Sequence, residues 1–502
     1  MDLVKMLNEI LEDYSDVRVA HLTGIERTRL NRIRNGKFKI TLPELQKIIS
    51  AFVTDDNQAN KLYDAYLFDK IGRDKYNSRI LAKEFLESLR EADPQDPDFD
   101  GSYARTNISS DFDIEDDLTV LRSPVAVRHA MNMVMMQAMS QKEKIRIISS
   151  SVSEYLLSQI FTVTSAVPDL EIDHIYSLAA VNELPEPLTY YMGVAKAVYP
   201  IFMLNSNYRA YYMLVGHATN ALMPYHIITN RFGLLLDPTF SNAILVKKKD
   251  VVMLAQHLFD DRKKKCSAFI TKINSTEEYL LHYCNILERT DGLMKDLYYS
   301  IDYEPCMLDF LTEKEIYGCM ERVKGDPKAA NLVKEFVGKF YTPFMQNKQI
   351  SFFTKEGLHS FIDTGTIKEI PETLGLVVDK KRRIEILQCV LSCMKDEKSG
   401  KIYYLINEKE FKPPLGLRYF GAGVKADHMF VISNSYSRDS SGENKEAGKV
   451  PSILILTNSE ILSAVFDFIE SLPETKMVYS REESIEYMEN VISEMKKELS
   501  EQ

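Results

Sequence analysis

The sequence predicts a multidomain protein in which a small all-α N-terminal bundle precedes a large mixed α/β (α+β) region. Apolar residues at helical spacing, separated by short turns, fill the first 70 residues. Beyond residue 118, apolar strands alternate with amphipathic helices, as in 145–150 (strand), 152–161 (helix) and 171–178 (strand). The chain has 502 residues, 45% hydrophobic and 27% charged, which allows a large core and three or more domains.

The first patterned segment is DVRVAHLTGIERTRLNRIRNGKFK, residues 16–39. It combines a small residue where two helices meet, a glycine at the turn between them and three apolar contacts: Ala20, Gly24, Ile25, Leu30 and Ile33. Val19 and Leu22 extend this apolar face. We expect the second helix to begin near Glu26 and to end at Asn35-Gly36, because both residues tolerate positive φ. Apolar residues at helical spacing over 42–52 then close the bundle. This spacing predicts a helix-turn-helix.

The helix that begins near Glu26 carries basic residues on or near its outward face: Arg27, Arg29, Arg32 and Arg34, with Thr28 among them. Between residues 18 and 47 there are eight Lys or Arg and two Glu, a balance of +6, whereas the whole chain carries −11. A basic patch on an acidic chain favours docking on nucleic acid through that patch. The alternative is a solvated helical face that holds a protein partner.

The order Val19-Ala20, Gly24-Ile25, Leu30, Ile33, Asn35-Gly36-Lys37 resembles the phage-repressor-like (Cro/C1, or xenobiotic-response-element type) helix-turn-helix transcriptional regulators. The resemblance covers about residues 1–55. It implies that the side chains reading DNA bases are Arg27, Thr28, Arg29 and Arg32, with Arg29 reading bases or phosphate. It also places at DNA phosphates Asn35, the amide of Gly36, Lys37 and Lys39, and we expect Arg18 to contact a phosphate as well.

Two residues depart from the pattern of this family. Asp16 stands where the family often has a Gln that bonds a phosphate, so Arg18 or His21 would have to make that contact. Glu26 replaces the usual Ser or Thr cap of the recognition helix; it suits the helix dipole but would be repelled by a phosphate. We expect Glu26 to face away from DNA or to accept a hydrogen bond from a cytosine amino group.

The predicted domains are a helix-turn-helix DNA-binding domain (1–70), a helical connector with an acidic linker (71–118), a first α/β lobe (119–330), and a helical segment with a second α/β lobe and a C-terminal helix (331–502). The acidic linker spans about residues 91–117 and is rich in Asp, Glu, Pro and Ser. An apolar helix is expected at 120–139. Further helices are expected at 332–344, 355–362 and 380–394, and a final helix carries one apolar face that indicates packing on its own lobe or, alternatively, a dimer contact.

A possible internal repeat relates the two lobes. Residues 242–259, NAILVKKKDVVMLAQHLF, align without gaps on residues 452–469, SILILTNSEILSAVFDFI, at an offset of 210. Each reads as a buried strand, a polar turn and an amphipathic helix. Similar tripeptides, 228–230 and 432–434, end a strand upstream of each copy. Two related lobes or convergence between short βα units both explain this similarity.

Specific catalytic or metal-binding patterns are absent from the sequence. It contains no GxxxxGK[ST], strand-linked GxGxxG, HExxH or GxSxG motif, and its six cysteines form no CxxC pair. We therefore expect no catalytic residues, no metal, no cofactor and no enzymatic activity, with an enzyme in the large C-terminal region as the open alternative. Without a run of 18 apolar residues or a signal peptide, we expect a cytoplasmic protein without a membrane partner.

These observations favour a transcriptional regulator that reads a half-site of double-stranded DNA as a homodimer, with a C-terminal region that senses a small-molecule or peptide effector, dimerises, or both. Two alternatives stay open. The large region is an enzyme or defence effector carrying a self-repressing DNA-binding module, or the chain is a protein-interaction scaffold.

Overall fold

The computed structural model describes residues 2–89, 116–273, 281, 297–335, 348–433 and 452–501, apart from gaps at 168, 205–206, 217–220, 308–309, 323–326, 368–375, 397, 414–415, 423–424 and 457. The acidic linker predicted at 91–117 lies almost wholly outside these residues. The chain forms two compact units, 1–80 and 81–502. The first is all-helical and the second is mixed α/β, as the sequence predicts.

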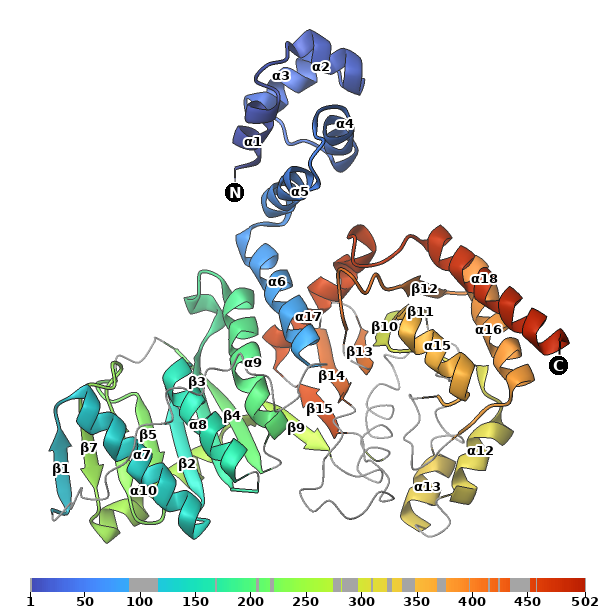
Figure 1. The fold of residues 1–502 in the computed structure, drawn as a ribbon. Helices are drawn as coiled ribbons and strands as arrows, with labels where there is room; N and C mark the ends of the chain where they lie inside the picture. Colours follow the sequence, from blue (N-terminus) through green and yellow to red (C-terminus); the bar gives the residue numbers. More distant parts are fainter. Residues whose placement is uncertain are drawn as a thin grey trace. The chain divides into compact units, whose positions relative to one another are not determined.

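Five helices and the beginning of a sixth form the N-terminal unit (Figure 1): α1 (Leu3–Ile10), α2 (Asp16–Thr23), α3 (Arg27–Arg34), α4 (Leu42–Phe52), α5 (Asp56–Ile71) and α6 (Arg73–Ser88). Their core contains Val19, Ile25, Leu30 and Ile33 of the predicted motif together with residues of α1, α4 and α5. The prediction that Leu22 belongs to the apolar face is wrong, because Leu22 is 52% exposed. Local signals fix the helix ends, since α4 begins with a Thr41/Glu44 capping box.

The second unit begins with a lobe built on an eight-stranded sheet. Its strands are β1 (Leu118–Leu121), β2 (Ile145–Ser149), β3 (Ile172–Ala179), β4 (Tyr208–Val215), β5 (Tyr225–Ile228), β6 (Gly233–Leu236), β7 (Ala243–Val246) and β8 (Ser267–Ala268). Its helices are α7 (Pro124–Gln141), α8 (Glu154–Ala166), α9 (Pro187–Leu204) and α10 (Lys249–Lys263), with a short 3-10 turn at Val181–Glu183. The helix predicted at 120–139 begins later than expected, because Val120 and Leu121 pair with β7 and Ser123 caps α7.

The second lobe is built on a seven-stranded sheet. Its strands are β9 (Ile270–Ile273), β10 (Leu297–Asp302), β11 (Lys348–Phe353), β12 (Lys401–Leu405), β13 (Gly416–Ala422), β14 (Lys425–Ser433) and β15 (Ser452–Leu456). Its helices are α12 (Glu313–Arg322), α13 (Pro327–Glu335), α15 (Lys355–Thr364), α16 (Lys380–Lys395), α17 (Ser459–Ser471) and α18 (Arg481–Ser500), with a 3-10 turn at Leu472–Glu474. The domain prediction assigned β9 and β10 to the first lobe, whereas both strands pair within this second sheet.

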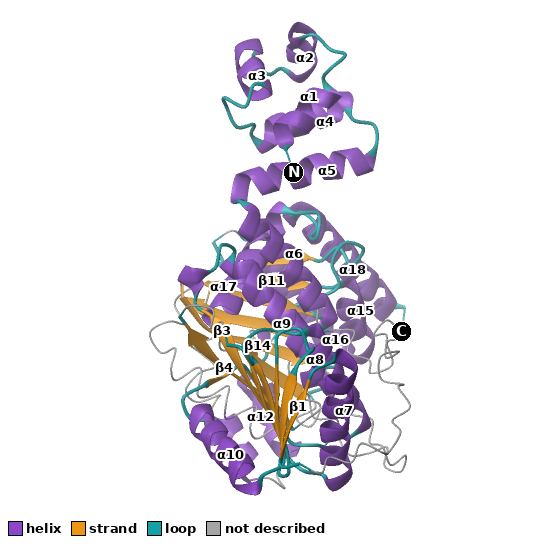
Figure 2. Cartoon of the chain, turned by 90° about the vertical axis from the view of Figure 1, so that its left-hand side faces the viewer, coloured by secondary structure: helices purple, strands orange, loops and turns teal. Residues whose placement is uncertain are grey.

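Helices cover both faces of the first sheet. α7, α8 and α9 share a core with Ile145, Ile147 and Ile172, whereas α10 covers the opposite face and packs Phe259 on Ile148 and Ile175 (Figure 2). With both faces covered, seven of the eight residues of β3 are buried, including the polar residues Asp173, His174 and Ser177. The main core extends into the second lobe, where α17 packs against α9.

The two sheets have the same strand order and the same pairing senses. The first runs β1-β7-β6-β5-β2-β3-β4, with β8 added at the edge, and the second runs β9-β15-β14-β13-β10-β11-β12. Each strand of the second sheet therefore corresponds to the strand of the first sheet whose number is lower by eight, so that β9 corresponds to β1 and β15 to β7. In both sheets the last three strands of this order are parallel and the remaining pairs are antiparallel. The two lobes are therefore alike in strand topology, as a repeat relating them would require.

The repeated segments occupy equivalent places in the two lobes. Residues 242–259 contain β7 and most of α10, and residues 452–469 contain β15 and most of α17. The similar tripeptides do not correspond, because Ile228 ends β5 whereas Ile432 lies in β14, whose counterpart is β6. The short strand-turn-helix similarity thus marks a real structural equivalence, and the tripeptide similarity does not.

The final helix packs on its own lobe. Its apolar residues Met488, Val491, Ile492 and Met495 lie in a core with residues of α15, α16 and β12. This result confirms intramolecular packing for that face. Over the described residues, none of the helices is both long enough and apolar enough to cross a membrane.

Candidate nucleic-acid interface

The turn between α2 and α3 is fixed by two residues. Gly24 has φ +66° and ends α2, with its amide donating to the carbonyl oxygen of Ala20 at 2.9 Å. Thr23 is buried; its hydroxyl donates to the carbonyl oxygen of Val19 (2.7 Å) and accepts from the amide of Ile25 (3.2 Å). The sequence prediction did not include Thr23. This hydroxyl holds the turn that sets α3 at an angle to α2.

One face of α3 is exposed and polar. Arg27, Thr28, Asn31 and Arg32 are all exposed, and their spacing places them side by side on consecutive turns. Asn31 was not among the predicted site residues, because its partners could not be read from the sequence. Its side-chain amide donates to Asp16 at 3.3 Å. The exposed face therefore presents two guanidinium groups, a hydroxyl and an amide.

Arg29 points away from this face. It forms a two-pronged ion pair with Glu44 of α4, through Nε to Oε1 and through Nη2 to Oε2 at 2.9 Å. The hydrogen bond from Arg29 is the main cause that lowers the pKa of Glu44 to about 2, and contacts with Thr41 contribute. The same pair raises the pKa of Arg29. Glu44 thus serves two functions, as capping residue of α4 and as counter-ion for α3.

Arg34 is also held inside the module. Its Nη1 donates to Asp16 Oδ1 at 2.7 Å, its Nε donates to Asn8 Oδ1 at 3.0 Å, and Asn8 Nδ2 donates back to the carbonyl oxygen of Arg34 at 2.9 Å. Both side chains of the ion pair are 22% exposed. Asp16, which departs from the family pattern, therefore connects the first turn of α2 to the last turn of α3.

The residues predicted at phosphates have different environments. Lys37 and Arg18 are exposed, and the Arg18 guanidinium lies 5.2 Å from the ring centroid of Tyr14. Lys39 is exposed too, but its Nζ donates to the carbonyl oxygen of Asp69 at 2.8 Å. The amide of Gly36 donates to the carbonyl oxygen of Ile33 at 2.9 Å. This amide is already used in ending α3, so it is not offered to a phosphate.

The segment that follows α3 contains an aromatic residue that the sequence prediction omitted. Phe38 is 45% exposed, and the Arg32 guanidinium lies 5.1 Å from its ring centroid. Such a contact orients a guanidinium and restricts its rotamers. Asn35 follows α3 and donates through Nδ2 to the carbonyl oxygen of Asn31 at 2.7 Å. Glu26 is exposed and caps α3 without a side-chain hydrogen bond.

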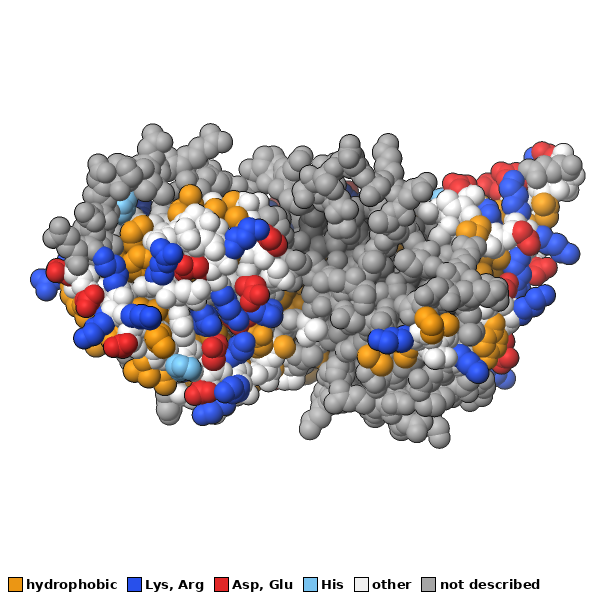
Figure 3. Space-filling view, turned by 90° about the horizontal axis from the view of Figure 1, so that it is seen from below, with side chains coloured by type: hydrophobic (Ala, Val, Ile, Leu, Met, Phe, Trp, Pro, Cys, Tyr) orange, Lys and Arg blue, Asp and Glu red, His pale blue; other side chains and the backbone are white. Residues whose placement is uncertain are grey.

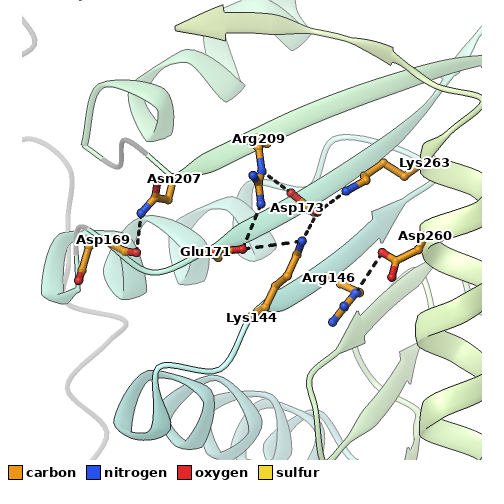
Figure 4. Close-up of polar contacts among 9 residues, drawn as sticks. All are labelled: Lys144, Arg146, Asp169, Glu171, Asp173, Asn207, Arg209, Asp260 and Lys263. Atoms are coloured by element: carbon orange, nitrogen blue, oxygen red, sulfur yellow. Dashed lines mark hydrogen bonds and ion pairs between the residues drawn. The ribbon is translucent and has the colours of Figure 1, made fainter. Parts of the chain in front are cut away.

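A second polar cluster lies on the α10 side of the first lobe (Figure 4). The fully buried carboxylate of Asp173 accepts from Lys144 (2.7 Å), Arg209 (2.7 Å) and Lys263 (2.9 Å). Burial by itself raises the pKa of Asp173, but these three hydrogen bonds outweigh it and hold the pKa below its ordinary value. Arg209 also pairs with Glu171 at 3.1 Å. The cluster joins β2, β3 and β4 to the end of α10, which is a structural role.

On the other face of the same sheet, His174 is completely buried. Its Nε2 lies 2.7 Å from the Ser149 hydroxyl and its Nδ1 lies 2.9 Å from the Tyr208 hydroxyl, which in turn contacts the Tyr176 hydroxyl at 2.9 Å. Burial lowers the pKa of His174 to about 3. All four residues are at most 2% exposed, so the Ser149-His174 pair is out of reach of a substrate. No group of three metal-ligating side chains exists in the described part of the chain.

Comparisons with known proteins do not assign this chain to a family. Neither a protein-family model nor a curated protein matches it. Among solved structures, TrmBL2, an archaeal chromatin protein, is 12% identical with a TM-score of 0.22, over 52% of this chain and 98% of that one. Polyphosphate kinase from Porphyromonas gingivalis is 10% identical, with a TM-score of 0.22, over 75% of this chain and 53% of that one. Phosphatidylserine synthase from Haemophilus influenzae Rd KW20 is 7% identical, with a TM-score of 0.23, over 76% of this chain and 93% of that one. These scores identify neither a fold nor a function.

Proposed function

We propose that this protein is a DNA-binding regulator whose helix α3 reads the major groove of a duplex half-site. The single observation that carries the proposal is the sorting of the four arginines of α3. Arg29 and Arg34 are neutralised inside the module by Glu44 and Asp16, whereas Arg27 and Arg32 are exposed on one face. A face that only needed solvation would not require this sorting.

The chemistry of the exposed face suits base edges. Arg27 and Arg32 can each donate two hydrogen bonds to a guanine, Asn31 can pair with an adenine, and Thr28 offers a hydroxyl and a methyl group. Arg32 is oriented by Phe38, which lowers the entropy lost on binding. We therefore propose Arg27, Thr28, Asn31 and Arg32 as base readers. In this proposal Arg29 has a structural role and does not read bases.

For the phosphates we propose Arg18, Lys37 and the side chain of Asn35, which are exposed around α3. Lys39 joins them when it exchanges Asp69 for a phosphate, because both side chains of that 3.3 Å ion pair are substantially exposed. Glu26, exposed at the beginning of α3, disfavours a phosphate at the dipole end of this helix and directs the arginines toward bases.

We further propose that the protein acts as a homodimer, since one small module contacts few base pairs and two modules gain affinity and specificity. In this proposal residues 81–502 dimerise and respond to a small-molecule or peptide effector, which alters the fit to two half-sites.

The direct test is the salt dependence of binding of the full chain to a random-sequence duplex. We expect log Kd to depend linearly on log salt, with a slope that reports several phosphate contacts. The double variant Arg27→Ala/Arg32→Ala should bind this mixture more weakly, whereas Arg29→Met should leave the slope unchanged. If the wild-type chain does not bind DNA at low salt, the proposal is wrong.

A further inference from the structure

The exposed amide of Asn31 is held by two polar neighbours. Its Nδ2 donates to Asp16 Oδ2 at 3.3 Å, and its Oδ1 accepts from Asn35 Nδ2 at 3.1 Å. Asp16 is itself held, since its other oxygen accepts from Arg34 Nη1 at 2.7 Å. The side chain that would face the groove in the proposed function is therefore fixed by contacts within the module.

These contacts determine which way round the amide of Asn31 lies. A carboxylate can only accept hydrogen bonds, so Asp16 requires the Nδ2 of Asn31. Asn35 Nδ2 also donates to the carbonyl oxygen of Asn31 at 2.7 Å, and this oxygen can only accept. Asn35 therefore presents its NH2 group, which requires the Oδ1 of Asn31. Two separate partners thus select the same orientation.

The same contacts set what Asn31 can still offer to a ligand. A side-chain amide has two N–H donors and an oxygen with two lone pairs. Asp16 uses one of the donors and Asn35 uses one of the lone pairs. One N–H and one lone pair remain, on a side chain that is exposed.

A single donor beside a single acceptor fits the major-groove edge of adenine. Adenine presents an acceptor at N7 and a donor at N6, whereas guanine presents two acceptors, cytosine a donor, and thymine an acceptor and a methyl group. An unrestrained amide could turn both of its N–H groups toward the two acceptors of guanine. Because Asp16 uses one of these N–H groups, guanine would meet the oxygen of Asn31 with an acceptor of its own.

The first lobe presents a different kind of surface. On the face of this lobe that Figure 3 shows, described Lys and Arg side chains lie among Asp, Glu and hydrophobic side chains. Lys144, Arg209 and Lys263 share the carboxylate of Asp173 there. A nucleic acid would meet repulsion as well as attraction on such a surface. Discrimination between bases is therefore assigned to the N-terminal unit.

We infer that Asp16 is a positioning residue that restricts one position of the DNA half-site to adenine by fixing the amide of Asn31. The inference rests on the proposed function and deepens it, because it names the base that Asn31 reads and the residue that excludes guanine. Asp16 acts through Asn31 and need not touch DNA.

Binding of the full chain to duplexes that differ at one base pair tests this inference. The parent duplex is the sequence that the wild-type chain enriches from a random library, and the position of interest is the one whose base preference is lost in Asn31→Ala. Fluorescence anisotropy compares the four possible base pairs at this position. We expect the wild-type chain to bind adenine there about 5- to 150-fold more tightly than guanine.

Asp16→Ala frees the second N–H of Asn31, so the ratio of adenine to guanine binding should fall to near one at this position and stay unchanged at the others. Arg34→Met is the matched control, because it breaks the same ion pair but leaves Asp16 beside Asn31. It should keep the preference for adenine and weaken all four duplexes alike, since an unpaired carboxylate repels phosphates. In an Asn31→Ala background, Asp16→Ala should change nothing further at this position.

Four results would overturn the inference. They are an Asn31→Ala variant with unchanged base preference, a position read by Asn31 that prefers another base, an undiminished preference for adenine over guanine in Asp16→Ala, and equal relaxation of all positions in Asp16→Ala and Arg34→Met. The last would show that Asp16 acts only by holding α3. The first two need no Asp16 variant, so they decide the matter even if Asp16→Ala does not fold.

The proposed function survives each of these results as long as base preference still depends on Arg27 and Arg32. A wild-type chain that enriches no sequence would reject the proposed function, and the inference with it.

Discussion

Asp16 at the start of α2 and Arg34 at the end of α3 form a 2.7 Å ion pair that joins the two helices of the motif. Asp16 also accepts from Asn31 on the exposed face of α3. The residue that departs most clearly from the family pattern is therefore the one that positions α3 against α2. Under the proposed function, a carboxylate at this position gives up a phosphate contact and fixes α3 against α2.

Replacing individual basic residues by Ala should distinguish the residues that read bases from those that contact phosphates. Arg32→Ala or Arg27→Ala should cost about 1–3 kcal/mol of binding free energy on the preferred duplex and relax base preference. Lys37→Ala should weaken all sequences alike and lower the salt slope by about one. Fluorescence anisotropy on matched and mismatched duplexes measures both effects. Equal loss of preference in all three variants would refute the assignment of roles.

The Arg29-Glu44 pair should contribute to stability in a defined pH range. Its contribution is present above the ordinary Glu pKa of 4.5, because the pKa of Glu44 is lower in the folded chain, and it is lost as the pH falls toward about 2. Glu44→Gln should lower the free energy of unfolding of the N-terminal unit at pH 6 by about 1 kcal/mol, since solvent screens this pair. Calorimetry at pH 6, 4 and 3 should show this difference shrinking. A difference that is independent of pH would contradict the role of the ion pair.

Removing the buried charge of Asp173 should destabilise the first lobe. Asp173→Asn leaves Lys144, Arg209 and Lys263 close together without their common counter-ion, and we expect a loss of about 3 kcal/mol. Glu171→Gln is the matched control: it contacts two of the same cations, but its side chain is 55% exposed. It should cost less than about 1 kcal/mol. Urea unfolding compares the two, and equal losses would exclude the buried carboxylate as the centre of the cluster.

The buried His174 should make the second unit sensitive to mild acid. Its pKa is about 3 in the folded chain and 6.5 ordinarily, so folding disfavours the cation. Above about pH 6.5 the titration of His174 does not lower the free energy of unfolding, and this free energy falls as the pH is lowered toward 3. Between pH 6 and 4 the wild type should lose about 2–3 kcal/mol more than His174→Gln, which cannot titrate. Parallel losses in the two proteins, measured by urea unfolding at each pH, would show that His174 is not the titrating group.

The helix-turn-helix could be predicted from the sequence because its signals are local. Gly24 and the Asn35-Gly36 pair mark the helix ends, and both glycines adopt positive φ in the structure. Val19, Leu30 and Ile33 repeat at helical spacing and are buried. Leu22 shares that spacing but lies exposed, because periodicity does not show how wide a buried face is.

The sorting of the arginines could not be predicted. Arg29 and Glu44 are 15 residues apart, and Asp16 and Arg34 are 18 apart. Which acid meets which base depends on the packing of α2, α3 and α4, so the sequence made the arginines of α3 look equivalent. Asn31 was missed for the same reason.

The strand order was also beyond the sequence, because it depends on pairings between distant segments. Only the strand-turn-helix of 242–259 and 452–469 kept its spacing and was detected. Among the described residues, two helices lie between β10 and β11 and two between β11 and β12, whereas one α-helix lies between β2 and β3 and one between β3 and β4. Because of these different insertions, the remaining equivalent strands are not separated by one constant number of residues, and the sequence shows no repeat there.

Selection of bound duplexes from a random library by the full-length chain tests the central claim most directly. The account predicts enrichment of an inverted repeat whose half-sites lie about ten base pairs apart, and loss of that enrichment in Arg27→Ala/Arg32→Ala but not in Arg29→Met. A single half-site would support base reading by α3 without a dimer on DNA. No enrichment by the wild-type chain, or an unchanged motif in Arg27→Ala/Arg32→Ala, would contradict the claim that α3 reads DNA.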